Sequence, residues 1–148
     1  MGSNILRNEK GFALIIALLI LLVLTLIGIS AISTSTFETS ISGNERVGTD
    51  AFYAAEAGIQ IGLNQLPDIT RIDLRAIGKD SYCRSGSLRD KDPKDLKSLG
   101  VYSKPGFDSS WGFKRYQVNA TGSSFRAMKE LEVQSRFGPF SAGTQYNN

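Results

Sequence analysis

One long uncharged stretch near the amino terminus constrains this chain more than any other feature. No Asp, Glu, Lys or Arg occurs in residues 11–37, and fifteen of the 21 residues 12–32 are Phe, Leu, Ile or Val. As a helix, 21 residues span about 31 Å, which matches a hydrocarbon core of about 30 Å. Those fifteen side chains favour insertion by about 5 to 9 kcal/mol in total. The sequence therefore predicts a helix that crosses a membrane once.

The charges on either side of the stretch predict its orientation. Arg7 and Lys10 precede it, whereas three acidic residues and only one basic residue, Arg46, follow closely after it. Flanks rich in lysine and arginine stay in the cytoplasm. We therefore expect residues 1–10 in the cytoplasm and everything after residue 40 outside. The stretch is too long for the apolar core of a cleaved secretory signal, while a plain single-pass anchor stays open as an alternative.

The chain lacks most of the residues from which enzymes build active sites. It has no histidine, and Cys83 is its only cysteine. A Ser-His-Asp triad, a His-ligated zinc site and a multi-cysteine cluster are thereby excluded for this chain alone. Neither a GxxxxGK[ST] nor a GxGxxG motif occurs. We expect no catalytic residue, no cofactor and no metal site. Three roles stay open for Cys83: a free thiol, a small buried apolar residue, or a bridge to another chain.

A short polar leader ends directly at the apolar stretch. It closes with Lys10-Gly11, and Phe12 opens the apolar run with nothing between. In a secretory signal the cleavage site follows the apolar run, whereas here the cleavage-like feature precedes it. This arrangement resembles a type IV prepilin with a class III leader. The resemblance implies that a prepilin peptidase cuts after Gly11 and methylates the new amino terminus, Phe12.

One position departs from the pattern of most such pilins. They carry a glutamate as the fifth residue of the mature chain, where it partners a neighbour's amine in the filament, whereas here that residue is Ile16. A carboxylate at this depth is costly unless it is paired. A subunit without it cannot supply that charge to its neighbour. The glutamate-free pattern resembles the PilX-type minor pilins and the tip pseudopilins of type II secretion.

Helical periodicity continues beyond the apolar stretch. Glycine, serine and threonine are frequent in residues 33–43, where we expect a kink or partial melting. After it, apolar residues recur every three or four positions until Pro67 ends the run: Phe52, Ala55, Ile59, Leu63 and Leu66. On the adjoining face Ala54, Gly58 and Gly62 recur every four residues, which predicts a sheet packed closely there. The segment AFYAAEAGIQ, residues 51–60, extends the PilX-type resemblance to about residue 63.

The carboxyl-terminal region predicts one short helix and a β-hairpin. Residues 92–100 are expected to form the helix, with Asp92 as its cap and Gly100 at its end. Residues 112–120 and 125–137 are expected to form two strands, with a turn at 121–124 and with Gly138-Pro139 ending the pairing. Lys129 interrupts the inward row of the second strand and is expected at a sheet margin. That row consists of Phe125, Ala127, Leu131, Val133 and Phe137.

Two binding alternatives come from the same region. A calcium site would draw on Asp90, Asp92 and Asp95, but the loop pattern with its glycine and distal glutamate is missing. A stacking platform for single-stranded DNA would draw on Trp111, Phe113, Lys114, Arg115 and Tyr116. Such carboxylates are more often solvated and such aromatics more often core. We therefore expect neither calcium nor nucleic acid as a ligand.

Together these features predict an α+β, pilin-like precursor in which a long amino-terminal helix packs against a small antiparallel sheet. We expect a leader at 1–11, a transmembrane and filament-core helix at 12–40, an amphipathic upper helix at 41–66, and a globular α+β head at 67–148. The resemblance implies a minor pilin that primes pilus assembly or lies at or near the filament tip, in adhesion, motility or surface sensing. The alternatives are a tip pseudopilin of type II secretion and a single-pass anchored periplasmic binding module.

The resemblance also implies partners and a location. The expected partners are other major and minor pilins, the prepilin peptidase, the inner-membrane assembly platform and a tip adhesin, with membrane lipid around the helix before extraction. The chain is expected first in the bacterial inner membrane, with its head outside, and then in a cell-surface pilus.

Overall fold

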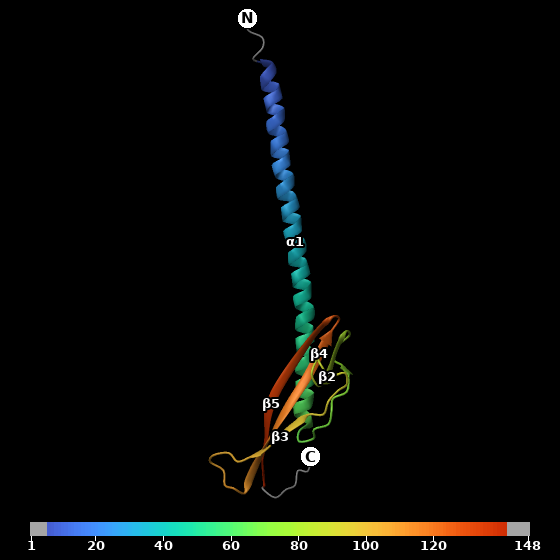
Figure 1. Ribbon diagram of the computed structural model, residues 1–148, viewed down its shortest axis with the longest axis vertical. Coiled ribbons are helices and arrows are strands. Elements are labelled where there is room, and N and C mark those ends of the chain that lie inside the picture. Colours follow the sequence, from blue (N-terminus) through green and yellow to red (C-terminus); the bar gives the residue numbers. More distant parts are fainter. Residues whose placement is uncertain (1–5, 142–148) are drawn as a thin grey trace. The chain divides into compact units, whose positions relative to one another are not determined.

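The computed structural model describes residues 6–141, and the chain divides into two compact units, Met1–Gly43 and Asn44–Asn148. We describe each unit by itself. One helix, α1, runs Leu6–Gln65 and contributes residues to both (Figure 1). It begins before the expected start at Phe12, because the sequence ahead of Gly11 contains good helix formers. Residues 1–5 of the expected leader and 142–148 of the expected head lie outside the described residues.

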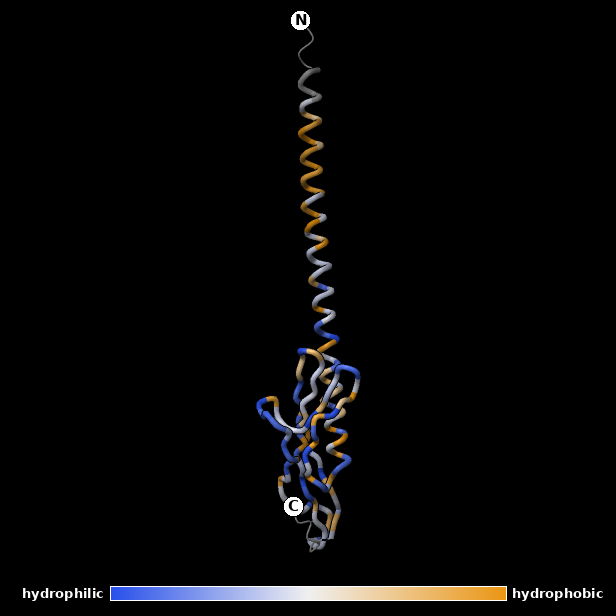
Figure 2. Tube along the Cα trace, turned by 90° about the vertical axis from the view of Figure 1, so that its right-hand side faces the viewer, coloured by the Kyte–Doolittle hydropathy of each residue, from blue (hydrophilic) through white to orange (hydrophobic). Residues whose placement is uncertain are grey.

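The first unit is helical from Leu6, and the side chains of its residues 11–43 are exposed. Every residue from 11 to 43 is exposed, and Figure 2 shows the hydrophobic colouring concentrated in this part of the chain. The helix also continues through residues 33–43, so the partial melting expected there does not occur. The hydroxyls of Thr34, Thr36 and Thr39 each donate to the carbonyl four residues earlier, which satisfies them within the helix. The hydroxyl of Thr25 donates to the carbonyl three residues earlier, that of Leu22, at 2.7 Å.

The second unit holds a five-stranded antiparallel sheet around one long strand. Its strands are β1 (Arg75–Ala76), β2 (Ser81–Ser85), β3 (Lys97–Tyr102), β4 (Trp111–Ser124) and β5 (Ala127–Ser141). Because β5 pairs with β4 along its whole length, β2 and β3 share the opposite edge of β4, one after the other. Figure 1 shows β4 and β5 lying along the carboxyl-terminal part of α1.

The core of the second unit lies between α1 and the sheet. Tyr116, Val118 and Ala120, alternate residues of β4, are fully buried, as expected for a strand with one face turned to a helix. The buried cluster and the half-buried residues packed against it are Ile59, Leu96, Val118 and Ala120, with Leu63, Leu66, Ile69 and Leu131. This packing confirms the predicted α+β layout, a long helix against a small antiparallel sheet.

The short helix predicted at residues 92–100 is wrong, because tertiary contacts hold this segment extended. Residues 93–96 have no regular structure, and β3 begins at Lys97. Leu96 is buried in the core, and its N–H donates to the Ile69 carbonyl at 2.9 Å. Gly100 does adopt a positive φ of 93°, but it lies where the β3–β4 register shifts, and not at a helix end.

The predicted hairpin is confirmed, but its turn lies further along the chain. The turn is formed by Phe125 and Arg126, and residues 121–124 belong to β4 because β2 pairs with them there. Phe125, expected inward, is therefore 72% exposed. The strand pairing also continues past Gly138-Pro139 to Ser141. Proline is tolerated at this place because β5 is an edge strand and its register shifts there.

Two other expectations about burial need correction or detail. Phe52, expected on the buried face of the helix, is 42% exposed, because the sheet packs instead on the small residues that include Ala51, Ala54 and Ala55. In the row of β5 expected to face inward, Ala127, Leu131 and Phe137 are half-buried, whereas Val133 is exposed although it pairs with the buried Val118. Lys129 is exposed on this edge strand, at the sheet margin where it was expected.

Candidate functional site

The residue pair expected at the cleavage site, Gly11 and Phe12, lies in the first turns of α1. The place where a Cβ of Gly11 would stand has no atom within 4 Å, and the Phe12 side chain is 65% exposed. Nothing in the described part of the chain therefore shields this peptide bond. A glycine inside a helix also lowers the helix's stability by about 1 kcal/mol relative to alanine, which favours local opening of the backbone at this point.

The segment after Gly11 is apolar enough to cross a membrane. Its most hydrophobic 18-residue window has a mean hydropathy of 3.3, and none of that window is buried by the rest of the chain. The large side chains exposed here include Leu14, Leu19 and Leu24, at 57% to 63%. Exposed apolar area on this scale is unfavourable in water. The helix therefore needs lipid or other helices around it.

Ile16 is the residue expected as the fifth of the mature chain, where the resemblance led us to look for a glutamate. It is 41% exposed on the same open helix, so this level of α1 presents an aliphatic side chain to its surroundings. The chain therefore offers no carboxylate at this position to an amine of a neighbouring subunit.

The predicted close contact between helix and sheet is present at the small residues of α1. A Cβ on Gly58 would lie 2.9 Å from Ala120 Cβ and 3.3 Å from Cys83 Cβ. A Cβ on Gly62 would lie 2.6 Å from Val118 Cγ1. Real Cβ atoms do not approach so closely, so these glycines allow the sheet to reach the helix surface. The four-residue spacing of Ala54, Gly58 and Gly62 predicted this face.

The sheet contributes a matching glycine that the sequence reading placed in a turn. Gly122 lies in β4, and a Cβ there would collide with backbone atoms of Ala51 and Ala55. Helix backbone and strand backbone therefore touch at this point. The sequence did contain a signal for this close contact. Four alternate side chains of β4 become steadily smaller: Tyr116, Val118, Ala120 and Gly122.

Cys83 belongs to the same contact. Its side chain is fully buried and forms no disulfide. Burial raises the pKa of the Cys83 thiol, while the nearby positive charge of Arg75 acts in the opposite direction. The thiol is therefore neutral and packs against α1 at Gly58. Of the three roles left open, the structure favours a small buried apolar residue.

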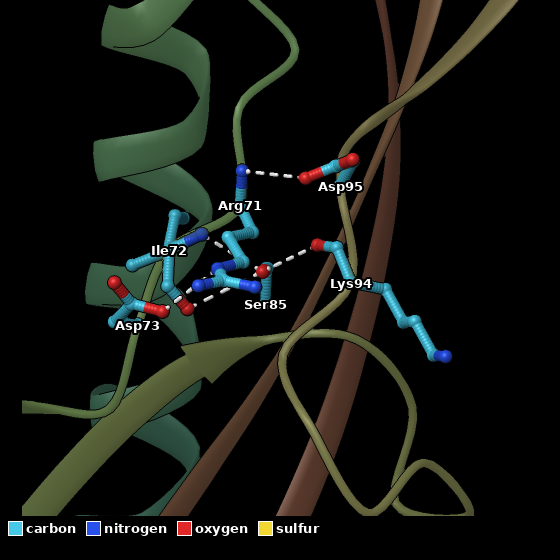
Figure 3. Close-up of polar contacts among 6 residues, drawn as sticks. All are labelled: Arg71, Ile72, Asp73, Ser85, Lys94 and Asp95. Carbon is cyan, nitrogen blue, oxygen red and sulfur yellow. Dashed lines mark hydrogen bonds and ion pairs between the residues drawn. The ribbon is translucent and has the colours of Figure 1, made fainter.

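A buried serine ties together three segments of the head. The Ser85 hydroxyl accepts a hydrogen bond from the Ile72 N–H at 2.9 Å and donates to the Lys94 carbonyl at 2.5 Å (Figure 3). The Arg71 N–H donates to a carboxylate oxygen of Asp95 at 3.1 Å beside it. These bonds hold the segments before β1 and before β3 against the end of β2. The sequence contains no local pattern for such contacts, because they join residues far apart in the chain.

Glu130 fastens the loop after β2 to the other face of the sheet. Its carboxylate accepts from the Asn119 amide at 2.8 Å, from the Ser87 hydroxyl at 2.9 Å and from the Leu88 N–H at 3.0 Å. The hydrogen bonds from Asn119 and Leu88 hold the pKa of the Glu130 carboxyl below its usual value. The role of Glu130 is therefore to position a loop, which the alternating pattern of β5 did not predict.

The residue set of the DNA platform is not assembled on one surface. Phe113 and Tyr116 are buried, and Lys114 is 5% exposed with its Nζ 5.3 Å from the centre of the Tyr116 ring. Arg115 instead stacks on Tyr102, with 5.6 Å between its Cζ and the ring centre. Only Trp111 of the three aromatics is exposed. These aromatics are mainly sheet core, as expected.

The acidic residues of the loop before β3 have structural partners. An Asp90 carboxylate oxygen accepts from the Ser87 N–H at 3.0 Å, and Asp95 accepts from the Arg71 N–H. Within residues 6–141, no group of three or more His, Cys, Asp or Glu side chains could hold a metal ion. Of the three carboxylates considered for calcium, Asp90 and Asp95 therefore shape the loop, and Asp92 is exposed.

Residues 10–60 match the family model described as PilX N-terminal. The match extends from the last residues of the leader through the apolar stretch to the AFYAAEAG segment. No curated protein and no solved structure matches the chain.

Proposed function

We propose that this chain, whose residues 10–60 match the PilX N-terminal family model, is a type IV pilin and acts as a minor pilin that primes pilus assembly or lies at or near the filament tip. The observation that carries the proposal is the contrast between the two units. The second unit buries a core, whereas every apolar side chain of residues 11–43 is exposed. Such a helix needs lipid before assembly and neighbouring helices after it.

The first step in this function is processing at Gly11. A prepilin peptidase cuts after Gly11, and Phe12 becomes the methylated amino terminus. The open surroundings of Gly11 and the exposed Phe12 side chain support this step, because a protease must reach the backbone on both sides of the bond. Residues 12–40 then form the filament-core helix, residues 41–66 the upper helix and residues 67–148 the head.

The aliphatic residue Ile16, in place of a glutamate, supports the role of a minor pilin. A subunit that lacks the glutamate cannot pair with the amino terminus of a neighbour at that depth of the filament core. This matters least for a subunit at the end of the fibre, which has neighbours on one side only. A terminal position suits adhesion, surface sensing or motility, and it places a tip adhesin among the partners, besides other pilins and the assembly platform.

The location follows from the charges around the helix. We place the amino terminus in the cytoplasm, the helix in the bacterial inner membrane and the head outside, before extraction into a surface pilus. The PilX pilins are structural proteins. We assign this chain an assembly role and no catalysis.

The proposal is tested in the native host by mass spectrometry of the amino-terminal peptide, together with shearing of surface filaments. A Gly11→Val variant, which places a branched side chain at the cleavage point, is expected to keep its leader and to stay in the membrane. A matched Gly28→Val variant, with equally open surroundings in the same helix, is expected to be processed. Equal processing of both variants would contradict the assignment of the site.

A further inference from the structure

Two arginines stand directly opposite each other on neighbouring strands of the sheet. Arg115 of β4 pairs with Arg136 of β5, and both side chains are exposed. Residues that face each other in this way lie on the same side of the sheet, and two like charges in such a pair lower its stability. Within residues 6–141 the structure has one ion pair, Arg71 with Asp73. The facing arginines therefore carry two positive charges that no carboxylate of the described residues neutralises.

The arginine pair lies on the face of the sheet that α1 does not cover. Alternate side chains of a strand point to opposite faces, and Val118 of β4 is buried against the helix. Arg115 and Gln117 therefore point outward. The next row on this outer face crosses three strands, because Lys97 of β3 pairs with Gln117, and Gln117 pairs with Gln134 of β5. We name five residues the basic patch: Lys97, Arg115, Gln117, Gln134 and Arg136.

The acidic residues around the basic patch do not enter it. On the outer face of β4 and β5, the first carboxylate beyond the two glutamines is Glu132, in the row of Asn119. Asp108, in the loop before β4, accepts from the Ser109 N–H at 2.7 Å. Asp90 and Asp95, in the loop before β3, also accept from backbone N–H groups. The basic patch itself holds three cations and no carboxylate, so its charge favours an anionic ligand.

A pocket adjoins the basic patch and shares two residues with it. It has a volume of about 530 Å³ and lies between the loop after β2 and strand β4. Lys97 and Gln117 line it, and Ser87, Lys94 and Asn119 add a hydroxyl, a further ammonium group and an amide. Pockets that hold small ligands have volumes of about 300 to 1,000 Å³. The patch and the pocket together therefore offer a charged surface that continues into a ligand-sized hollow.

The wall of the pocket is fixed by bonds within the head. The Arg84 guanidinium donates to the Asp90 carbonyl at 2.7 Å, which holds the loop after β2 from below. The Glu130 carboxylate accepts from the Ser87 hydroxyl at 2.9 Å and from the Asn119 amide at 2.8 Å, which ties the same loop to β4. A ligand does not have to order this loop when it binds, and such preorganisation favours affinity.

The chemistry of these groups fits an acidic oligosaccharide. Guanidinium groups bind oxyanions such as carboxylate and sulfate through paired N–H donors. Amide groups both donate and accept hydrogen bonds, as sugar hydroxyls do. Among the described residues, Leu96 is the only one with an apolar side chain that lines the pocket, and the basic patch contains no aromatic ring on which a base could stack. This composition favours a sugar chain with acid groups over an apolar ligand or a single-stranded nucleic acid.

We propose that the basic patch and the adjoining pocket bind an acidic oligosaccharide. Its carboxylate or sulfate groups bind Arg115 and Arg136, and its hydroxyls bind Gln117 and the amide and hydroxyl groups of the pocket. The four residues from Arg115 to Asn119 extend over about 13 Å of strand, which leaves room for more than one sugar unit. The inference goes beyond the proposed pilin function and does not depend on it, because all of these residues belong to the second unit.

The test is calorimetric binding to the full-length chain in detergent at low ionic strength, where screening is weak. The probes are short oligosaccharides of alginate, which carry carboxylates, and of dextran sulfate, which carry sulfates. We expect at least one of them to bind, the tighter one identifying the acid group, and neutral dextran oligosaccharides not to bind. Single-stranded DNA of the same charge is expected to bind several-fold more weakly than the tighter probe.

The decisive variant is Arg136→Gln, which is expected to weaken binding several-fold. Because it removes the repulsion from Arg115, its Tm is expected to equal or exceed that of the parent chain. The matched control is Arg126→Gln, the same substitution at an exposed position in the turn at the other end of β4 and β5, and it is expected to bind like the parent. Gln117→Ala leaves the charge unchanged and is expected to weaken binding a few-fold, because a sugar hydroxyl loses its partner.

Five results would overturn the proposal. They are no binding of either acidic probe, equal weakening by Arg126→Gln and Arg136→Gln, parent-like binding by Gln117→Ala, DNA binding as tight as that of the sugars, and a lowered Tm for Arg136→Gln, which would assign this arginine a structural role. Processing at Gly11 involves none of these residues, so the proposed pilin function is tested separately.

Discussion

The contact between β4 and α1 makes a sharp prediction about Gly122. A Cβ at this position would collide with backbone atoms of Ala51 and Ala55, which cannot rotate away as a side chain can. Gly122→Ala must therefore push the helix and the sheet apart. Overpacking of this kind costs about 1 to 3 kcal/mol, and the gain from replacing a strand glycine by alanine offsets only about 0.5 to 1 kcal/mol of it. Because the added Cβ would meet backbone atoms, we take the upper end of that cost, about 3 kcal/mol, and after the offset we expect Gly122→Ala to lower the free energy of unfolding by about 2 kcal/mol.

The assay is thermal unfolding of the full-length chain in detergent, followed by the fluorescence of Trp111, the only tryptophan. For a domain of this size, about 2 kcal/mol corresponds to a fall in Tm of about 8 to 16 °C. The control is Gly48→Ala, at a helix position with no atom within 4 Å of the added Cβ, which is expected to raise stability by up to about 1 kcal/mol. A Tm for Gly122→Ala at or above that of the parent chain would refute the reasoning.

Three further predictions concern the polar and sulfur groups of the head. Hydrogen bonding lowers the pKa of the Glu130 carboxyl. The ionised carboxylate therefore stabilises the fold above the unfolded-state pKa of about 4.3. This stabilisation is lost as the pH falls through the lower pKa of the folded state. The parent Tm is therefore expected to fall more steeply below pH 5 than that of Glu130→Gln, with Glu132→Gln behaving like the parent. Ser85→Ala leaves the buried Ile72 N–H and the part-buried Lys94 carbonyl without their partner and is expected to cost about 1 to 3 kcal/mol in urea unfolding. A change under about 0.5 kcal/mol would contradict the buried network. Cys83 is buried and its pKa is raised, so alkylation at pH 8 is expected to be slow in the folded chain and fast in urea, and equal rates would count against its burial.

Much of the layout could be predicted because it depends on local patterns. The uncharged run and the spacing of Ala54, Gly58 and Gly62 indicated the helix and its contact face. Alternation in residues 112–137 indicated the paired strands. The spacing of apolar residues and the local composition are enough to predict such elements, because each buries one face along its whole length.

The errors occurred where distant residues override a local signal. Asp92 and Gly100 have the form of helix ends, but the segment between them is extended because Leu96 enters the core and bonds to Ile69. The small residues 121–124 have the composition of a turn, but β2 pairs with them and α1 requires a glycine at Gly122. Phe52 has the helical spacing of a core residue, yet the sheet packs on the smaller residues beside it.

The candidate site divides in the same way. The roles of Gly11, Phe12 and Ile16 stay predictions, made from their order relative to the apolar run and from the resemblance to prepilins. The contacts of Ser85 and Glu130 were not found, because Ser85 bonds to residues 9 and 13 positions away and Glu130 to a residue 43 positions away. Only the folded arrangement brings these groups together.

The most direct test of the central claim is mass spectrometry of the amino-terminal peptide from membranes and from sheared surface filaments of the native host. The account predicts a filament peptide that begins at methylated Phe12. A chain that keeps its leader through Gly11 and occurs only in the membrane would contradict it and would leave a simple anchored protein.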